Sequence, residues 1–381
     1  MDSQLTATDQ AHLRRALELA ERGRGRVSPN PLVGAVIVRD GEVIGEGWHA
    51  ELGGLHAERA ALADCRERGK GPVGATMYVS LEPCAHQGRQ PPCVEAVLEA
   101  GIGRVVIASE DPSEKAAGRG PGILRDGGVE VAFAAGAEAT AARLLNQPFR
   151  KHARTGLPLV TLKLAISLDG QTATAPGDSP WISGEQSRAL VHRWRGEADA
   201  IAAGIGTVLA DDPLLTARGR LFPRIAEEKT TAPEPRQPLR IVFDSGARLP
   251  LDSQLLATLD QSPVLVVIAP EADQGRAVAL QGAGAEVLVV AGATPADRVA
   301  STLTELGRRG ITSLFLEGGR TLATAFQVAG HLDESRTFIA PVLLGGQGGG
   351  QIDPAPRVTA LHSTAEPVGE DVLITARYKE W

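Results

Sequence analysis

The sequence reads HAE at residues 56–58, LEPCAH at 81–86 and PPC at 91–93. These segments hold one histidine and two cysteines, a donor set that suits zinc because the ion favours nitrogen and sulfur ligands. Three protein ligands leave the fourth tetrahedral position open for water, which is the pattern of a catalytic zinc site. We therefore expect His56, Cys84 and Cys93 to hold zinc, which lowers the pKa of a bound water to about 7.

Glu58 stands two positions after the histidine, where it can take a proton from that water and pass it to a leaving amine. Zinc deaminases use H-x-E, then P-C and a second cysteine, with a glutamate that is not a ligand as acid and base. In this chain residues 85–92 separate the cysteines, in place of the common C-x-x-C. We expect helices to open at the ligand segments, because helix N-termini favour thiolates. A structural zinc site closed by His86 is the alternative, and it would leave Glu58 without a role.

Strands and helices alternate around these segments, which predicts an α/β layer fold. In the first half, apolar periodicity and turn residues predict helices at 8–24, 56–68, 92–100 and 123–127, and strands at 33–38, 42–48, 76–80, 104–108 and 129–134. The segment 146–158 is basic and ends in glycine and proline, so the domain boundary is expected there. The expected domains are residues 1–150, which carry the deaminase segments, and residues 156–381.

The second half repeats the alternation. It predicts strands at 159–166, 199–203, 239–244, 264–269, 286–290 and 313–317, helices at 184–197, 296–309 and 320–329, and an antiparallel strand pair at 336–344 and 371–378. The segments 222–238 and 345–350 are rich in proline or glycine and are expected to be exposed loops.

Composition limits the class of protein. The chain has 381 residues and a formal net charge of -7, which argues against a nucleic-acid-binding surface. Its three cysteines do not suggest a disulfide framework, and Cys65 is expected to be a buried core residue. No apolar run reaches the roughly 20 residues of a membrane span. A cytoplasmic protein without nucleic-acid or membrane partners is the expectation.

Further motifs extend along the whole chain and show a resemblance to known families. The first domain resembles the cytidine-deaminase-like superfamily, and the whole chain resembles the bifunctional deaminase/reductases of riboflavin biosynthesis. Besides the zinc segments, the matching text comprises NPLVG (30–34), DP (111–112), AGRG (117–120), Lys163, SLDG (167–170), WIS (181–183), TVLADDP (207–213), LTAR (215–218) and EGG (317–319).

The resemblance implies an N-terminal cytidine-deaminase-like α/β/α domain followed by a dihydrofolate-reductase-like α/β domain. The first would hydrolyse the 2-amino group of a diaminopyrimidinone phosphoribosylamine. The second would reduce the ribosyl side chain to ribityl with NADPH. The partners would be small phosphoribosylated pyrimidines, and related enzymes form homo-oligomers through the reductase domain.

Residue roles carry over by motif. In the deaminase, His56, Cys84 and Cys93 would bind zinc, Glu58 would shuttle the proton, and Asn30 and His49 would contact substrate. The reductase positions that match cofactor contacts are Ala165, Trp181, Thr207, Asp211, Ser245, Gly319, Arg320, Thr321, Leu322, Ala323, Thr324 and Ala325. The reductase positions that match substrate contacts are Lys163, Ser179, Arg195, Leu215, Arg218 and Glu317.

The residue types agree with these roles. Arg195 and Arg218 can bind a phosphate through two donors each, and the turn Gly318-Gly319-Arg320 lets backbone N–H groups approach a pyrophosphate. Arg248 is either a contact to the 2′-phosphate or a solvated loop residue. The chain departs from the family at Ser113-Glu114, where Asn and Pro are usual, and at Gln90, where Thr is usual, which leaves ribose-phosphate binding open.

Two other functions compete with this interpretation. A nucleic-acid base deaminase with an accessory nucleotide-binding domain would share the zinc residues, but the acidic balance and the large second domain argue against it. A regulatory protein with a degenerate first half is disfavoured by the intact zinc set. In the second half no single residue is evident as the proton donor, because hydride chemistry belongs mainly to the cofactor.

Overall fold

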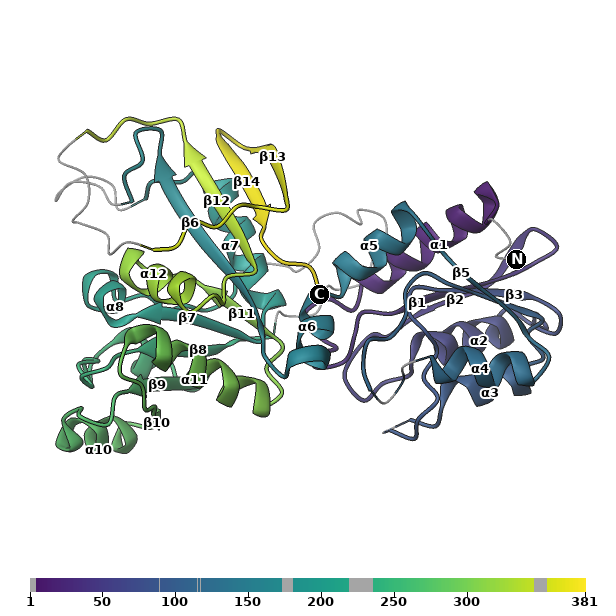
Figure 1. Ribbon diagram of the computed structural model, residues 1–381, viewed down its shortest axis with the longest axis horizontal. Helices are drawn as coiled ribbons and strands as arrows, with labels where there is room; N and C mark the ends of the chain where they lie inside the picture. The colour runs from purple at the N-terminus through teal and green to yellow at the C-terminus, as the bar shows by residue number, and fades with distance from the viewer. Residues whose placement is uncertain are drawn as a thin grey trace. The chain divides into compact units, whose positions relative to one another are not determined.

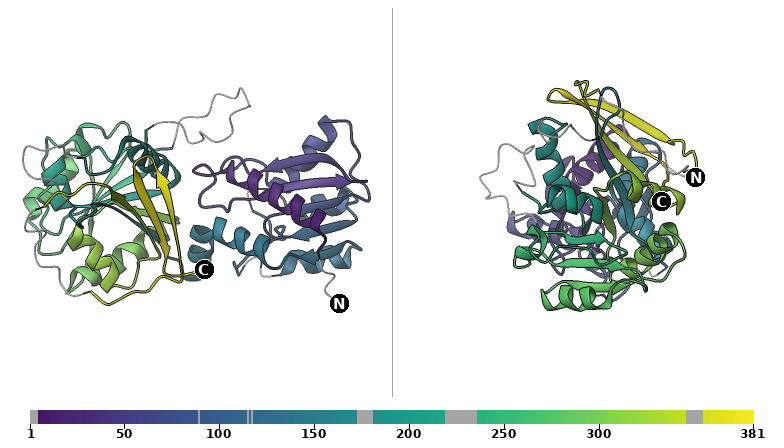
Figure 2. Two further views of the ribbon diagram at one scale, coloured as in Figure 1. Left: turned by 90° about the horizontal axis from the view of Figure 1, so that it is seen from above. Right: turned by 90° about the vertical axis from the view of Figure 1, so that its left-hand side faces the viewer.

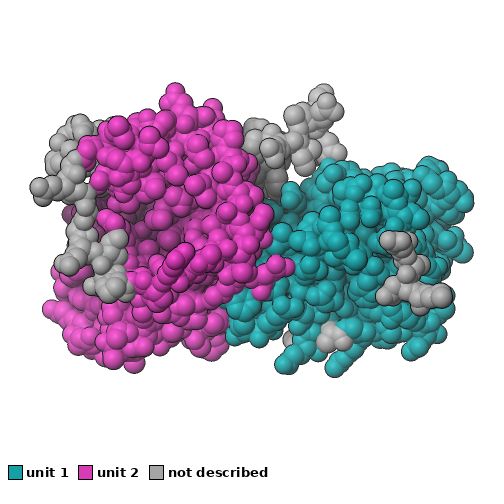
Figure 3. All heavy atoms as spheres, turned by 45° about the horizontal axis from the view of Figure 1, so that its top comes forward, with its two compact units in different colours: residues 1–156, 381 teal, residues 157–380 magenta. Residues whose placement is uncertain are grey.

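The computed structural model describes residues 5–88, 90–114, 116, 118–172, 181–218, 236–345 and 355–381. The chain forms two compact units, one of residues 1–156 together with Trp381 and one of residues 157–380 (Figure 3). No helix in the described ranges combines the length and the apolar character that a membrane span requires.

The first unit is built on a five-stranded mixed sheet in the order β2-β1-β3-β4-β5. Strand β1 pairs with both β2 and β3 in antiparallel fashion, whereas β3, β4 and β5 run parallel to one another. Its elements are α1 (Ala7–Glu21), β1 (Gly34–Arg39), β2 (Glu42–Trp48), α2 (Ala57–Glu67), β3 (Thr76–Val79), α3 (Cys93–Glu99), β4 (Arg104–Ile107), α4 (Arg119–Asp126), β5 (Glu130–Phe133), α5 (Ala137–Leu145) and α6 (Gln147–Thr155).

Both faces of this sheet are covered by helices, as Figure 1 shows: α1 and α5 lie on one face, and α2, α3 and α4 on the other. The alternation of strand residues explains the two layers, because successive side chains point to opposite faces. In β1, Ala35 and Ile37 join the core under α2 and α3, whereas Val36 and Val38 join the core under α1. The sequence therefore predicts the α/β/α layering of this unit correctly.

The second unit is built on a nine-stranded sheet in the order β10-β9-β8-β7-β11-β6-β12-β14-β13. The strands from β10 to β12 are parallel, and β14 and β13 add an antiparallel edge. Its elements are β6 (Leu159–Ser167), α7 (Glu185–Glu197), β7 (Ala200–Gly204), α8 (Ile205–Asp211), β8 (Leu239–Phe243), α9 (Gln254–Ala257), β9 (Val264–Ile268), α10 (Gln274–Gly282), β10 (Glu286–Val289), α11 (Pro295–Arg308), β11 (Ser313–Leu316), α12 (Arg320–Val328), β12 (Glu334–Ala340), β13 (His362–Val368) and β14 (Asp371–Arg377).

Two apolar cores lie on opposite faces of this sheet. Figure 2 shows the ribbon from two further directions. Val191 and Trp194 of α7 belong to one core, and Leu303 of α11 and Phe326 of α12 to the other. The central parallel strands β7, β8, β9 and β11 are buried on both faces, which explains why they read as continuous apolar runs.

The structure adds elements to those expected from the sequence. The segment 146–158, expected to hold the domain boundary, contains α6, which belongs to the first unit. Helices α5, α8, α9 and α10 and strand β13 were not expected. Strand β13 escapes pattern analysis because its residues are almost all exposed at the edge of the sheet, so no alternation of apolar side chains marks it.

Candidate active sites

The three expected zinc ligands come from two helix starts and one loop of the first unit. His56 is the N-cap residue of α2, with an extended backbone, and Cys93 is the first residue of α3. Cys84 lies in the loop after β3, and its sulfur accepts a hydrogen bond of 3.3 Å from the backbone N–H of Cys93. The N-terminus of α3 therefore supports negative charge on Cys84, as expected for a thiolate ligand.

The spacing of the ligand atoms fits zinc. His56 Nδ1 lies 3.5 Å from Cys84 Sγ and 3.3 Å from Cys93 Sγ, and the three ligand atoms all lie within 4.8 Å of one another. Tetrahedral zinc with Zn–N of about 2.0 Å and Zn–S of about 2.3 Å separates a nitrogen and a sulfur ligand by about 3.5 Å. The donor set and the distances both fit the ion.

His86 does not belong to this ligand group within the described part of the chain. Its Nδ1 is buried without a hydrogen-bond partner there, and the residue lines the adjoining cavity. A structural site closed by His86 therefore has no geometric support. Three protein ligands remain, which is the pattern of an open, catalytic position.

Glu58 lies in the first turn of α2, beside the ligand group but outside it. Its side chain is buried and also lines the cavity. Burial raises the pKa of Glu58 to about 7, and the negative charge of Cys84 adds to the effect. A carboxyl group with a pKa near neutrality can both accept and donate a proton at physiological pH.

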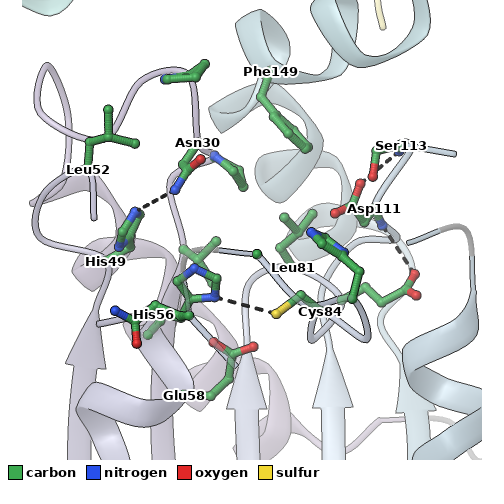
Figure 4. A pocket seen from close by; sticks show the side chains of 18 of the residues that line it. Asn30, His49, Leu52, His56, Glu58, Leu81, Cys84, Asp111, Ser113 and Phe149 are labelled. Atoms are coloured by element: carbon green, nitrogen blue, oxygen red, sulfur yellow. Dashed lines mark hydrogen bonds between the residues drawn. The ribbon is translucent and has the colours of Figure 1, made fainter. Parts of the chain in front are cut away.

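A cavity of about 360 Å³ opens above these groups, and Figure 4 shows the side chains that line it. On one side, Asn30 Nδ2 lies 3.1 Å from His49 Nε2, and His49 Nδ1 lies 2.9 Å from the Leu55 carbonyl oxygen. The carbonyl accepts from Nδ1–H, so Nε2 accepts from Asn30. Burial lowers the pKa of His49, which agrees with a neutral ring. Both expected substrate contacts thus face the cavity in a fixed orientation.

The other wall contains Asp111 and Phe149, to which sequence analysis assigned no role, and Ser113, the departure from the family that left ribose-phosphate binding open. Asp111 and Ser113 follow β4, and the Ser113 N–H donates to Asp111 Oδ1 at 2.8 Å. Phe149 lies on α6, and its ring points toward the cavity in Figure 4. Phe149 lies far from the zinc segments in sequence. Its part in the cavity becomes visible only in the folded unit, where α6 lies beside the cavity.

In the second unit, the expected substrate residues Lys163, Arg195 and Glu317 come together. Arg195 on α7 holds Glu317, which follows β11, through two bonds: Nε–Oε1 at 2.6 Å and Nη2–Oε2 at 2.9 Å. Burial raises the pKa of Glu317, but the charges of Arg195 and Lys163 outweigh it and leave the pKa lowered. Burial lowers the pKa of Lys163, which lies on the neighbouring strand β6.

The loop after α8 joins the same cluster. The Thr216 carbonyl oxygen accepts from Arg195 Nη1 at 3.2 Å, so the loop is tied to the ion pair. Leu215, just before it, is buried with a φ of 51°, a left-handed conformation that is uncommon for leucine. Arg218 is exposed at the end of the described segment, and Ser179 lies outside the described residues.

Two of the expected cofactor segments, that of Thr207 and that of Gly319, meet at the carboxyl ends of the neighbouring parallel strands β7 and β11, where ligands of α/β sheets bind. A Cβ on Gly319 would lie 3.5 Å from Thr207 Oγ1, so these two segments touch. Gly319 is the N-cap of α12 and no side chain caps this helix, which leaves its first N–H groups for a phosphate. This arrangement fits a dinucleotide such as NADPH, whose phosphates residues 319–325 would meet.

The other expected cofactor residues are more dispersed. Ala165 lies on β6, Asp211 ends α8, and Ser245 is exposed after β8. Trp181 is 63% exposed and carries the Arg188 guanidinium 5.2 Å from its ring centre. Arg248 Nε lies 3.6 Å from Asp244 Oδ1, so a protein partner already accounts for part of its charge.

These two sites define an α/β protein that joins a zinc-dependent deaminase to a reductase. Residues 6–109 match the family model for the cytidine and deoxycytidylate deaminase zinc-binding region, and residues 158–374 match that for the RibD C-terminal domain. The chain is 40% identical over 378 residues to the riboflavin biosynthesis protein RibD of Actinobacillus pleuropneumoniae, covering 97% of this chain and 95% of that protein. It is 41% identical over 350 residues to RibD of Escherichia coli, covering 88% and 89%.

The solved structures agree. RibD of Acinetobacter baumannii superimposes with a TM-score of 0.79 at 36% identity, covering 98% of this chain and 99% of that chain. A deaminase/reductase from Thermotoga maritima gives 0.79 at 32% identity with the same coverage. The chain belongs to the RibD family of bifunctional riboflavin biosynthesis enzymes. It is thus a zinc-dependent deaminase and an NADPH-dependent reductase, as the sequence predicted.

Proposed function

We propose that the first unit deaminates 2,5-diamino-6-(5-phosphoribosylamino)pyrimidin-4(3H)-one and that the second unit reduces the ribosyl side chain of the product with NADPH. The product of both steps is 5-amino-6-(5-phosphoribitylamino)uracil. The observation that carries the first half is the group of His56, Cys84 and Cys93 with Glu58 beside it at the base of the cavity.

In the deaminase, His56, Cys84 and Cys93 would hold zinc. The ion would act as a Lewis acid that lowers the pKa of a water at its open position to about 7. Glu58 accepts one proton as the water oxygen bonds to C2 of the pyrimidine and passes it to the ring nitrogen that is double-bonded to C2, and it carries the second proton of the water to the 2-amino nitrogen. The C2–N bond then breaks, ammonia leaves, and C2 keeps the oxygen as a carbonyl. The raised pKa of Glu58 supports both transfers.

The two walls of the cavity are assigned to different parts of this substrate. Asn30 and His49 lie close to the zinc ligands, and the His49 and His56 ring centres are 5.3 Å apart. We assign them to the pyrimidine. Asp111, Ser113 and Phe149 form the opposite wall, and we assign them to the ribose phosphate end (Figure 4).

In the reductase, NADPH would supply a hydride to C1 of the ribosyl group, while the bond from C1 to the ring oxygen breaks and that oxygen takes a proton, which gives the open ribityl chain. Thr207 and the start of α12 would bind its phosphates. Lys163 and Arg195 bring positive charge to the substrate site. Glu317, which pairs with Arg195, carries the negative charge beside them. The Leu215 to Arg218 loop is tied to this cluster through Thr216, which supports its role in substrate binding.

The substitution Glu58→Gln tests the assignment of the deaminase. The amide keeps the size of the side chain but cannot accept the proton, so ammonia release should fall by about 100- to 10,000-fold. Zinc content and reduction of directly supplied deaminated substrate should remain at the wild-type level. Ammonia release at an undiminished rate would show that Glu58 is not the proton shuttle.

For its surroundings, we propose a cytoplasmic enzyme that forms homo-oligomers through the second unit and does not bind nucleic acid. The free cysteines and the net charge of -7 support the first and last of these points. Sedimentation of the full chain tests the oligomer. Salt-sensitive binding to RNA would instead favour the nucleic-acid deaminase.

A further inference from the structure

Trp381 packs within the first unit, although most of the chain before it belongs to the second. Its backbone N–H donates to Gln147 Oε1 at 2.9 Å, and its carbonyl oxygen accepts from Gln147 Nε2 at 3.1 Å and from Arg150 Nε at 2.6 Å. Lys151 Nζ lies 5.3 Å from the centre of the indole ring. Three residues of α6 therefore hold Trp381, two of them through its backbone.

Arg150 is the centre of this arrangement, because its side chain is only 1% exposed. Besides Trp381, its guanidinium donates through Nη1 to Ser109 Oγ and to the Glu110 carbonyl oxygen, both at 3.1 Å, and through Nη2 to Glu110 Oε1 at 2.7 Å. A buried charge needs such partners, since an unpaired one costs several kcal/mol. Arg150 thus joins Trp381 to the end of β4.

Arg150 lies on α6 and binds the end of β4, and both of these segments lead directly into the far wall of the deaminase cavity. Glu110 precedes Asp111, and Ser113 is held by the Asp111 carboxylate. On α6, Phe149 is the neighbour of Arg150 in sequence and faces the cavity. The Ser109 carbonyl oxygen also accepts from the Glu82 N–H at 2.9 Å, so the LEPC segment is fixed to the same strand end.

We propose that Arg150, anchored by the backbone of Trp381, is a positioning residue that sets the distance between the Asp111–Ser113 wall and Phe149 and thereby the affinity for the phosphoribosyl end of the deaminase substrate. This inference rests on the proposed function of the first unit. Arg150 itself does not line the cavity. It acts through its neighbours, and the group that it positions lies on the side opposite Asn30 and His49 (Figure 4).

The location of this wall determines which kinetic constant responds. Glu58 and the zinc ligands lie on α2, α3 and the loop after β3. No described residue of these segments bonds to Arg150 directly, and the loop reaches the same strand end through the backbone N–H of Glu82. A shifted wall weakens binding of the substrate in its ground state and its transition state alike, which raises KM and leaves kcat nearly unchanged.

The test is steady-state deamination by the full-length protein with Arg150→Leu and Arg150→Lys. Loss of charged hydrogen bonds on this scale should raise KM by about tenfold or more, with kcat within about threefold. The lysine variant keeps the charge but not the planar fork, so its KM should lie between those of the wild type and the leucine variant. Zinc content and the kinetics of reduction serve as internal references.

Arg154→Leu is the matched control. Arg154 also lies on α6 and approaches Glu110 Oε1, but at 4.0 Å and with a side chain 43% exposed. Removal of Arg154 deletes a positive charge near the same carboxylate but leaves the bonds to Ser109 and Trp381 in place. Because exposed ion pairs contribute little, KM should stay within about twofold. An equal rise in KM for both variants would show a charge effect, and the proposal would be wrong.

A second comparison tests the anchor. A chain shortened to end at Glu380 should reproduce the KM rise, and combining it with Arg150→Leu should add little, because the two changes break the same connection. Trp381→Ala keeps the backbone and should have a smaller effect than the shortened chain. If the variants only lose active protein, kcat falls at constant KM, which contradicts positioning. Absence of ammonia release by the wild type would instead contradict the proposed function.

Discussion

Arg195 and Glu317 form a two-point ion pair in which both side chains are almost buried, 13% and 12% exposed. Their motifs suggested two separate substrate contacts, but in the folded protein each is the other's first partner. Lys163 and the Thr216 carbonyl oxygen complete the cluster. A substrate phosphate or hydroxyl would therefore meet donors whose orientation is already set.

We expect Glu317→Gln to impair reduction, because it leaves the charges of Arg195 and Lys163 without their carboxylate. Breaking a buried pair by removing one partner typically costs about 3–5 kcal/mol. The value for kcat/KM of reduction should fall by about 100-fold or more, measured by the loss of nicotinamide absorbance with deaminated substrate. Deamination by the same protein is the control, and unchanged reduction would show that the pair is dispensable.

Removal of one zinc ligand should abolish deamination and spare reduction. We expect Cys93→Ala to lower the zinc content from about one ion per chain, the stoichiometry of a three-ligand site, to near zero. Cys65→Ala is the matched control, since Cys65 is equally buried but lies outside the ligand group. Elemental analysis together with ammonia release measures both effects, and zinc retained by the Cys93 variant would contradict the assigned ligand set.

Acid stability should depend on Asp9, whose Oδ1 accepts from Arg104 at 2.7 Å and from Tyr78 at 2.9 Å. Burial raises its pKa, but the bonds from Arg104, Thr6 and Tyr78 outweigh burial and leave the pKa lowered. The unfolded chain, with an Asp pKa of about 3.9, therefore binds the proton first as pH falls. The stabilisation is complete above about pH 5 and declines progressively below pH 4.

The variant Asp9→Asn checks this dependence. It should destabilise the first unit at pH 7 by roughly 1.5–3 kcal/mol, the scale of hydrogen bonds to a charged group. The difference between variant and wild type should shrink as the pH falls below about 4. Denaturant unfolding across this pH range gives the comparison. A difference that is constant with pH would mean that the charge of Asp9 is not involved.

Gly47 should be needed for the position of α2, the helix that begins at the zinc ligand. A Cβ at residue 47 would lie 2.3 Å from the Ala61 backbone nitrogen and 2.7 Å from the Ala57 carbonyl oxygen. Gly47→Ala must push α2 away from β2, which should cost about 1–3 kcal/mol and lower deamination. Gly122→Ala is the control, because nothing lies within 4 Å of its Cβ. Equal thermal stability of both variants would disprove this packing argument.

Local patterns account for what the sequence predicts well. The helix expected at 8–24 is α1, which begins slightly earlier because Thr6 caps it through a reciprocal pair of bonds with Asp9. Periodicity locates the end of a helix only to within one or two residues, so it does not identify the capping residue. The far wall of the cavity was missed for another reason. Asp111 belongs to the DP motif but had no assigned role, and Phe149 carries no motif. Both become part of the site only through β4 and α6.

The chemistry of the two sites followed from the sequence alone, because metal binding and phosphate binding require residue types that can be read from their order: His56, Cys84 and Cys93 for the metal, Glu58 for the proton, and glycines before α12. Tertiary structure alone decided that Glu317 pairs with Arg195 and that Trp381 returns to Arg150. These contacts join residues far apart in the chain, and their partners are selected by burial, since a charge removed from water must take the nearest partner that the packing provides.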